Sequence, residues 1–221
     1  MLKKILVAPS LLAADFSCLG SEIEKIEREA DFLHLDVMDG HYVPNLSFGV
    51  AVISSVRKVS ELFFDVHLMI SDPGAYIGAF AKAGADGITF HLETVRSPEE
   101  LISEIHSVGK KAGISIHPDT PIENVFPFLP LADIVLVMSV RPGFGGQAFM
   151  ETAPARILAV RRELDRTGSK AILSVDGGID AKTAPLAVHS GAEMLVAGSY
   201  VFGSPVPRDA IASLKSLVGT V

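Results

Sequence analysis

Two short runs of the chain place ionisable side chains on alternate positions of otherwise apolar segments. The first run carries His34 and Asp36, and the second carries Asp65 and His67. Successive side chains of a strand point to opposite faces, so each run predicts one apolar face and one face that holds histidine and aspartate. A buried strand with such a face indicates a chemical site and not only a core.

Four ionisable residues are predicted to lie at the ends of three different strands. His34 and Asp36 belong to one strand, His67 to the next, and Asp176 to a much later one. Two imidazoles and two carboxylates suit one divalent metal ion, with zinc as the first expectation and ferrous iron, manganese or cobalt as alternatives. Taken singly, each residue fits an ordinary hydrogen-bonded histidine or ion-paired aspartate. The convergence of all four favours the metal.

The two carboxylates predict proton chemistry beside that metal. Asp36 and Asp176 are expected on opposite faces of a carbon next to a carbonyl, where one removes a proton and the other returns one. The result is inversion of that carbon. A neighbouring cation makes an aspartate a weaker base, so the metal must acidify the substrate and a closed site must restore the basicity of the carboxylate.

Three methionines also fall at the predicted ends of strands. A single methionine is an ordinary gap-filler in a core. Three at the same end favour a soft wall that keeps water from a planar intermediate, and they are Met38, Met69 and Met138.

Three glycine-containing segments follow the last three predicted strands. Backbone N–H groups in such segments bind phosphate without net positive charge, and loops after the late strands are the usual phosphate position in (β/α)8 barrels. No P-loop or dinucleotide fingerprint occurs, so we expect a small phosphorylated substrate and no nucleotide. The segments are Pro142-Gly143-Phe144-Gly145-Gly146-Gln147, Asp176-Gly177-Gly178 and Ala197-Gly198-Ser199.

The elements that must position these residues alternate between strand and helix along the chain. Eight strand–helix units in 221 residues predict an α/β fold, a compact (β/α)8 barrel in one domain over residues 1–221. A doubly wound open sheet is the alternative, but no predicted strand has the charged character of an edge. Strands are expected at 4–9, 32–38, 62–69, 86–91, 112–117, 132–139, 170–176 and 193–198. Helices are expected at 17–29 (capped by Ser17), 98–109, 149–166 and 208–218, with weaker signals at 49–58, 74–83, 121–129 and 180–189.

Composition argues against several other classes of protein. A net charge of −7 provides no basic surface for nucleic acid. The single cysteine, Cys18, allows no internal disulfide and is compatible with a reducing compartment. The first residues resemble a short signal peptide, but Pro9 and Asp15 interrupt the apolar run, so a first strand is the better interpretation. No apolar run approaches the roughly 20 residues of a membrane span, and we expect a cytoplasmic enzyme.

Long motifs of the chain resemble those of the ribulose-phosphate 3-epimerases nearly from end to end. The two most specific are His34-Leu35-Asp36-Val37-Met38-Asp39-Gly40-His41-Tyr42-Val43-Pro44-Asn45 and the 142–147 segment. The resemblance implies a TIM barrel of the ribulose-phosphate-binding type. It also implies interconversion of D-ribulose 5-phosphate and D-xylulose 5-phosphate through an enediolate in the pentose phosphate pathway, by a homo-oligomer that is a dimer or a hexamer.

The resemblance also assigns roles to individual residues. Asp36 and Asp176 would form the acid–base pair and, with His34 and His67, would bind one metal ion per subunit. Ser10, His67 and Asp176 would contact the sugar. The phosphate end would be held by Gly143, Phe144, Gly145, Gly146, Gly177, Gly178, Gly198 and Ser199, and the family's methionines match Met38, Met69 and Met138. One departure is Arg141, where Asn or an acidic residue is expected, and it is predicted to shift phosphate affinity or an interface.

Three other activities compete with this interpretation. Epimerisation of allulose 6-phosphate would use the same mechanism, but the Gly-Gly pair after Asp176 favours the pentose, since Gly-Ser is expected in the hexose enzyme. A lyase or decarboxylase would need a catalytic lysine on a strand, and Lys170 opens its strand at the wrong end. A non-catalytic phosphate-binding barrel would leave the two histidines and two aspartates without a purpose.

Overall fold

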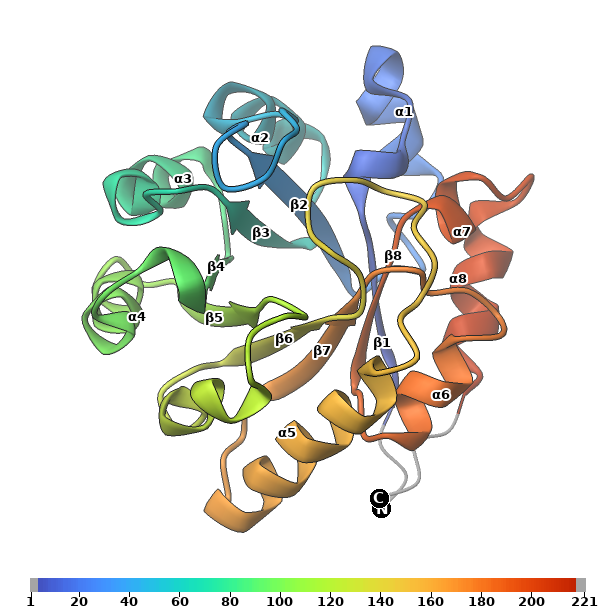
Figure 1. Ribbon diagram of the computed structural model, residues 1–221. Helices are drawn as coiled ribbons and strands as arrows, with labels where there is room; N and C mark the ends of the chain where they lie inside the picture. The colour runs from blue at the N-terminus through green and yellow to red at the C-terminus, as the bar shows by residue number, and fades with distance from the viewer. Residues whose placement is uncertain (1–3, 218–221) are drawn as a thin grey trace.

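Eight parallel strands form the centre of the computed structural model, which describes residues 4–217 (Figure 1). Neighbouring strands follow the order β1-β8-β7-β6-β5-β4-β3-β2. A single parallel bridge between Ser10 and His34 joins β1 to β2 and nearly closes the barrel. The predicted (β/α)8 barrel is confirmed. The strands are β1 Leu6–Pro9, β2 Phe32–Met38, β3 Phe63–Met69, β4 Gly87–His91, β5 Lys111–Ile116, β6 Ile134–Met138, β7 Ile172–Asp176 and β8 Met194–Ala197.

Helices surround the strands on the outside of the barrel (Figure 1). The α-helices are α1 Leu19–Glu24, α2 Val50–Val56, α3 Ile77–Ala83, α4 Pro98–Ser107, α5 Ala153–Thr167, α6 Ala184–His189, α7 Ser199–Phe202 and α8 Pro207–Lys215. Short 3-10 helices are η1 Leu11–Ala13, η2 Phe16–Cys18, η3 Arg57–Val59, η4 Gly74–Tyr76, η5 Leu92–Thr94 and η6 Ile122–Phe128. Within residues 4–217, none of the helices has the length and apolarity that crossing a membrane would require.

The strand bounds agree with the sequence prediction within two residues, whereas several helices differ. The segment predicted as a helix over 121–129 is a 3-10 helix, and Pro127 inside it has no N–H to donate to an α-helical ladder. The first helix is shorter than predicted, and its cap is not Ser17. Asp15 instead caps the preceding η2 by accepting a hydrogen bond from Ser17 N at 2.9 Å.

Other helix bounds also shift. Helices α5 and α6 begin at Ala153 and Ala184, about one turn later than predicted. The predicted end of the last helix at 218, and the ends of the predicted domain at 1–3 and 218–221, lie outside the described residues. The start of α4 at Pro98 and its termination before Gly109 are confirmed.

Strand parity separates two cores. Outward-facing residues such as Leu33, Leu35 and Val37 pack against the helices in the larger core. The interior of the barrel is apolar on one side, where Ala8, Ile134, Leu136, Met138, Val140, Met194 and Val196 form a cluster. On the other side it carries buried polar residues from β2 to β5, which are His34, Asp36, Asp65, His67, Thr89, His91 and Ser115. Most polar groups of the barrel interior therefore lie in one half, whereas β7 carries Ser174 and Asp176 in the other.

An acidic residue immediately before every even-numbered strand ties that strand to the start of the preceding one. Asp31 accepts from Val7 N at 3.0 Å, and Asp86 accepts from Phe64 N at 2.9 Å. The same contact recurs from Ala112 N to Asp133 at 2.9 Å and from Leu173 N to Glu193 at 3.3 Å. An alanine precedes each of these acids, so Ala-Asp or Ala-Glu marks the repeat in the sequence. These four hydrogen bonds fix the starts of the strands, at the end of the barrel remote from the predicted site.

We predict that Gly113→Ala destabilises the barrel. Gly113 faces Thr89 across the β4–β5 pair, and an added Cβ would lie 2.0 Å from Thr89 Oγ1 and 3.0 Å from its Cα. Overpacking of this kind costs about 1–3 kcal/mol in the free energy of unfolding, which denaturant titration measures. The exposed Gly78 in α3 has no atom within 4 Å of its added Cβ, so Gly78→Ala is the matched control and should cause no loss. Equal stability of Gly113→Ala and the original protein would contradict the tight fit.

Candidate active site

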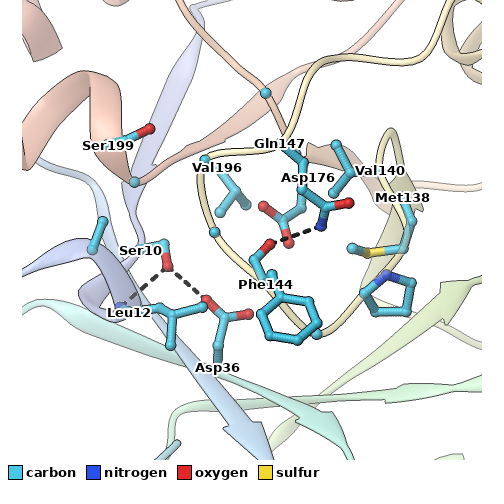
Figure 2. Close-up of a pocket in the computed structure, with 18 of the residues that line it drawn as sticks. Ser10, Leu12, Asp36, Met138, Val140, Phe144, Gln147, Asp176, Val196 and Ser199 are labelled. Atoms are coloured by element: carbon cyan, nitrogen blue, oxygen red, sulfur yellow. Dashed lines mark hydrogen bonds between the residues drawn. The ribbon is translucent and has the colours of Figure 1, made fainter. Parts of the chain in front are cut away.

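A pocket opens at the carboxyl ends of the strands (Figure 2). It gathers most of the residues that the sequence singled out. They are Ser10, Asp36, Met38, Met69, Met138, Gly143, Phe144, Gly145, Gly146, Asp176, Gly177, Gly178, Gly198 and Ser199. No lysine or arginine stands among the described residues that line the pocket. Any anionic group bound there must therefore be held by backbone dipoles and not by a cationic side chain.

The four residues predicted to bind metal converge; Asp36 and Asp176 line the pocket, whereas the fully buried His34 and His67 do not. One ligand atom each from His34, Asp36, His67 and Asp176 lies within 4.8 Å of the other three. Asp36 Oδ1 lies 3.3 Å from His34 Nε2 and 3.1 Å from His67 Nδ1, and those two nitrogens are 3.3 Å apart. Among the described residues, neither aspartate pairs with a lysine or arginine. Two carboxylates and two imidazoles with no cationic side chain among them fit a divalent ion, so this cluster could hold a metal.

Strand register and parity place the two aspartates. Asp36 is aligned with His67 across the β2–β3 pair, which puts both at the same level of the barrel. Asp176 is the last residue of β7, separated from β2 by β1 and β8. Figure 2 shows both carboxylates directed into the same space from different sides, with Asp36 beside Ser10. Ser10 Oγ donates a hydrogen bond to Asp36 Oδ2 at 2.6 Å and so fixes the orientation of that carboxylate.

The surroundings push the pKa values of the two aspartates in opposite directions. Burial alone would raise the pKa of Asp36, but the adjacent His34 and then His67 outweigh it and lower that pKa. Burial, reinforced by the charge of Asp36, raises the pKa of Asp176 to about 6. Burial would lower the pKa of His34, but Asp36 and Asp65 raise it well above its usual range. One aspartate therefore favours the ionised form while the other retains a proton more readily.

A second row of side chains supports the histidines. Asp65 Oδ2 accepts from His34 Nδ1 at 2.9 Å, and Thr89 Oγ1 donates to Asp65 Oδ1 at 2.8 Å. This arrangement turns His34 Nε2 towards the cluster. The sequence placed Asp65 on the same face of a predicted strand as His67 but did not reveal its contact with His34. The sequence did contain an indication of this contact, because both residues occupy inward-facing positions on adjacent strands.

The segment between β6 and α5 runs across the open end of the barrel (Figure 1) and is held by Asn45 and by hydrogen bonds within the segment. Asn45 Nδ2 donates to Gly143 O at 3.0 Å. Gln147 Nε2 donates to Arg141 O and Phe144 O at 2.7 and 2.8 Å. Phe144 remains half exposed at the rim. These contacts shape the side of the pocket that carries the glycines.

Arg141 itself is directed away from the pocket. Its guanidinium forms a two-point ion pair with Asp119, with Nε–Oδ2 at 3.2 Å and Nη2–Oδ1 at 3.1 Å. Both side chains are mostly exposed. The unusual residue at this position therefore links two loops and does not line the pocket.

Close packing requires glycine at the turn after β7. Gly178 has φ +62°, and a Cβ there would lie 2.5 Å from Phe149 N. Gly177 has φ +119°, and a Cβ there would lie 2.4 Å from Val140 Cγ2. Only glycine allows the backbone of this turn to approach the 147–149 segment, which leaves peptide groups on the wall of the pocket.

Several lining residues received no individual role from the sequence. Pro142 and Gln147 belong to the predicted 142–147 segment. The other residues add apolar side chains to the wall and lie close in sequence to predicted motifs, which was the available signal; they are Leu12, Ala13, Val140, Ile179 and Val196. His41, His106, His117 and His189 do not line the pocket.

Comparison with known proteins gives a consistent result. The model of the "Ribulose-phosphate 3 epimerase family" matches residues 6–202. The chain is 46% identical over 213 residues to a ribulose-phosphate 3-epimerase of Bacillus subtilis (strain 168), covering 96% of this chain and 98% of that protein. It is 42% identical over 217 residues to the cytoplasmic isoform from Oryza sativa subsp. japonica, covering 96% and 93%.

Solved structures support the fold. The crystal structure of a 3-hexulose-6-phosphate synthase has a TM-score of 0.69 at 20% identity and covers 96% of this chain and 98% of that one. Similarity at this identity shows the barrel alone. The match over residues 6–202 and the identity to curated relatives carry the assignment. The chain belongs to the ribulose-phosphate 3 epimerase family, and the protein is an isomerase.

Proposed function

We propose that the protein interconverts D-ribulose 5-phosphate and D-xylulose 5-phosphate by inverting C3, as a step of the pentose phosphate pathway. The observation that carries this proposal is the entry of Asp36 and Asp176 into one pocket from different sides, with glycine segments on the wall of the same pocket. The names of relatives at 42–46% identity support the choice of substrate. One domain over 1–221, a homo-oligomer and a cytoplasmic location stay predictions.

The metal would be held by His34, Asp36, His67 and Asp176. Zinc is the first expectation, with ferrous iron, manganese and cobalt as alternatives that the same donor set accepts. When bound, a divalent ion stabilises negative charge on the substrate carbonyl and so makes the neighbouring C–H more acidic.

Proton transfer is assigned to the two aspartates. One carboxylate removes the C3 proton from one face, which gives an enediolate, and the other, in its protonated form, delivers a proton to the opposite face. The entry of Asp36 and Asp176 into the pocket from different sides supports such a division. Because the reaction is reversible, the two residues exchange roles with its direction. Ser10 keeps the Asp36 carboxylate in position throughout.

The remaining lining residues bind and protect the substrate. We assign Met38, Met69 and Met138 to a wall that keeps water from the planar enediolate. Backbone N–H groups of the glycine segments are proposed to hold the phosphate. This assignment accounts for an anion-binding site in a chain of net charge −7 whose described pocket lining contains no lysine or arginine.

We predict that the purified protein converts D-ribulose 5-phosphate into D-xylulose 5-phosphate that carries deuterium at C3 when the buffer is deuterated. NMR spectroscopy measures both the conversion and the label. Chelation should abolish turnover, and added Zn²⁺ should restore it. Conversion of allulose 6-phosphate alone would contradict the choice of substrate, and product with unlabelled C3 would contradict the enediolate.

We predict that Asp36→Asn and Asp176→Asn each reduce kcat by about 10²–10⁴-fold or more, because an amide cannot serve as the proton-transfer group. Asp165→Asn, at an exposed position of α5, is the control and should retain activity. Circular dichroism verifies that all three variants are folded. Near-normal turnover in either site variant would contradict the two-aspartate mechanism.

We predict that Gly178→Ala raises the KM for the phosphorylated substrate about tenfold, because its Cβ would displace the backbone at Phe149 and disturb the adjacent phosphate wall. Inhibition by inorganic phosphate should weaken in parallel. Gly109→Ala is the matched control, since Gly109 also has a positive φ but has no atom within 4 Å of its added Cβ. That variant should lose stability through backbone strain alone, whereas its KM should not change. An unchanged KM in Gly178→Ala would count against the glycine wall as the phosphate site.

A further inference from the structure

His91 is a buried histidine that the proposed mechanism does not use. It is the last residue of β4, and it is fully buried beneath the pocket. Its ring plane is inclined by 27° to that of His67, with centroids 5.0 Å apart, and the two Nε2 atoms are 2.9 Å apart. On its other side, His91 Nδ1 lies 2.9 Å from Tyr42 Oη and 3.5 Å from Glu93 Oε2. His91 does not line the pocket, so its contacts point to a role exerted through His67.

The position of His67 determines which nitrogen must carry its proton. His67 presents Nδ1 to the cluster, 3.1 Å from Asp36 Oδ1 and 3.3 Å from His34 Nε2. A neutral imidazole that offers its Nδ1 lone pair to a metal carries its hydrogen on Nε2. That hydrogen is directed at His91 Nε2, which must accept it. The hydrogen of His91 then lies on Nδ1, where Tyr42 Oη and Glu93 Oε2 are the available acceptors.

We propose that His91 is a positioning residue that accepts the hydrogen bond from His67 Nε2–H and so holds the Nδ1 lone pair of His67 on the metal site. Tyr42 and Glu93 orient His91 in turn. Glu93 is itself anchored, because its Oε1 accepts from His117 N at 2.8 Å. This inference rests on the proposed metal site.

The two ligand histidines differ in a way that supports this assignment. His34 presents Nε2 to the cluster and donates from Nδ1 to Asp65, whereas His67 presents Nδ1 and donates from Nε2. A carboxylate at position 91 would add a further buried negative charge beside Asp36, Asp65 and Asp176. Neutral His91 accepts the hydrogen bond without that charge, and Glu93 lies one side chain further from the metal site.

Substitutions at position 91 separate the hydrogen bond from the volume of the ring. Gln places its amide oxygen near the position of Nε2 and can accept from His67, whereas Asn is shorter and reaches only the position of Nδ1. Phe fills the space without an acceptor. We therefore expect His91→Gln to retain the hydrogen bond from His67 and with it the orientation of His67. Both His91→Phe and His91→Asn should lose that hydrogen bond. His189→Gln, on the exposed end of α6, is the control for the chemical change.

The first readout is the affinity of the full-length protein for Zn²⁺, measured by competition with a chromogenic chelator. Loss of a partner that orients a ligand histidine weakens metal binding by about 10–100-fold, which we expect for His91→Phe and His91→Asn. His91→Gln should stay within a few-fold of the original protein. Tyr42→Phe, which leaves the His67–His91 contact in place, should weaken binding by a smaller factor. It also tests the inference if the variants at position 91 do not fold.

The second readout is the tautomer of His67 in the Zn²⁺-loaded protein, measured by NMR on protein with ¹⁵N-labelled histidine. An Nε2–H of His67 that is protected from exchange with water in the original protein and in His91→Gln, but not in His91→Asn, would support the inference. Unchanged Zn²⁺ affinity and unchanged Nε2–H protection in His91→Phe would overturn it. Where His91→Phe does not fold, unchanged Zn²⁺ affinity in Tyr42→Phe would do so. Failure of the original protein to bind Zn²⁺ would instead overturn the proposed metal site, on which the inference depends.

Discussion

The structure depends on the balance of charge among four side chains at the base of one pocket. Asp36 lies between two imidazole nitrogens at 3.1 and 3.3 Å, and Asp176 completes the group from another side of the barrel. Buried charges are stable only when they are paired or bound to a metal, and a divalent ion at this position would compensate both carboxylates. The same arrangement raises the pKa of Asp176 and lowers that of Asp36, so the two carboxyl groups differ in how readily they hold a proton.

The barrel meets this requirement by dividing its interior. Strands β2 to β5 carry the buried polar network, which includes Asp65 and Thr89 and satisfies the histidine nitrogens that face away from the cluster. Strands β6, β8 and β1 supply an apolar interior that makes no demand for hydrogen-bond partners. Phosphate binding is assigned to backbone groups in the loops after β6, β7 and β8. This assignment requires no buried cationic side chain near the charged residues of the proposed metal site. The interior therefore separates the proposed metal chemistry from the proposed phosphate site.

Much of this could be predicted from the sequence because strand parity is a strong rule. Alternation of His34, Asp36 and Met38 with apolar residues gave the inward face correctly, and the glycine segments gave one side of the pocket. The choice of ring nitrogen could not be predicted, because it depends on side-chain rotation and on neighbours from other strands, such as Asp65 and His91. The wrong predictions of one helix and one helix cap also have local causes in the sequence. Pro127 excludes an α-helix where apolar periodicity predicted one, and Ser17 lies inside the short η2, which Asp15 caps, instead of capping α1.

The central claim is that Asp36 and Asp176 serve opposite faces of C3. The most direct test is exchange of the C3 hydrogen with solvent in variants that interconvert the two epimers little. Each Asp→Asn variant retains one carboxylate and should still exchange the C3 hydrogen on the face which that carboxylate reaches. We predict that, in deuterated buffer, Asp176→Asn incorporates deuterium into C3 of one epimer, whereas Asp36→Asn does so for the other, with little interconversion in either case. NMR spectroscopy of the recovered substrates measures this. Exchange into the same epimer by both variants would contradict the assignment of one aspartate to each face.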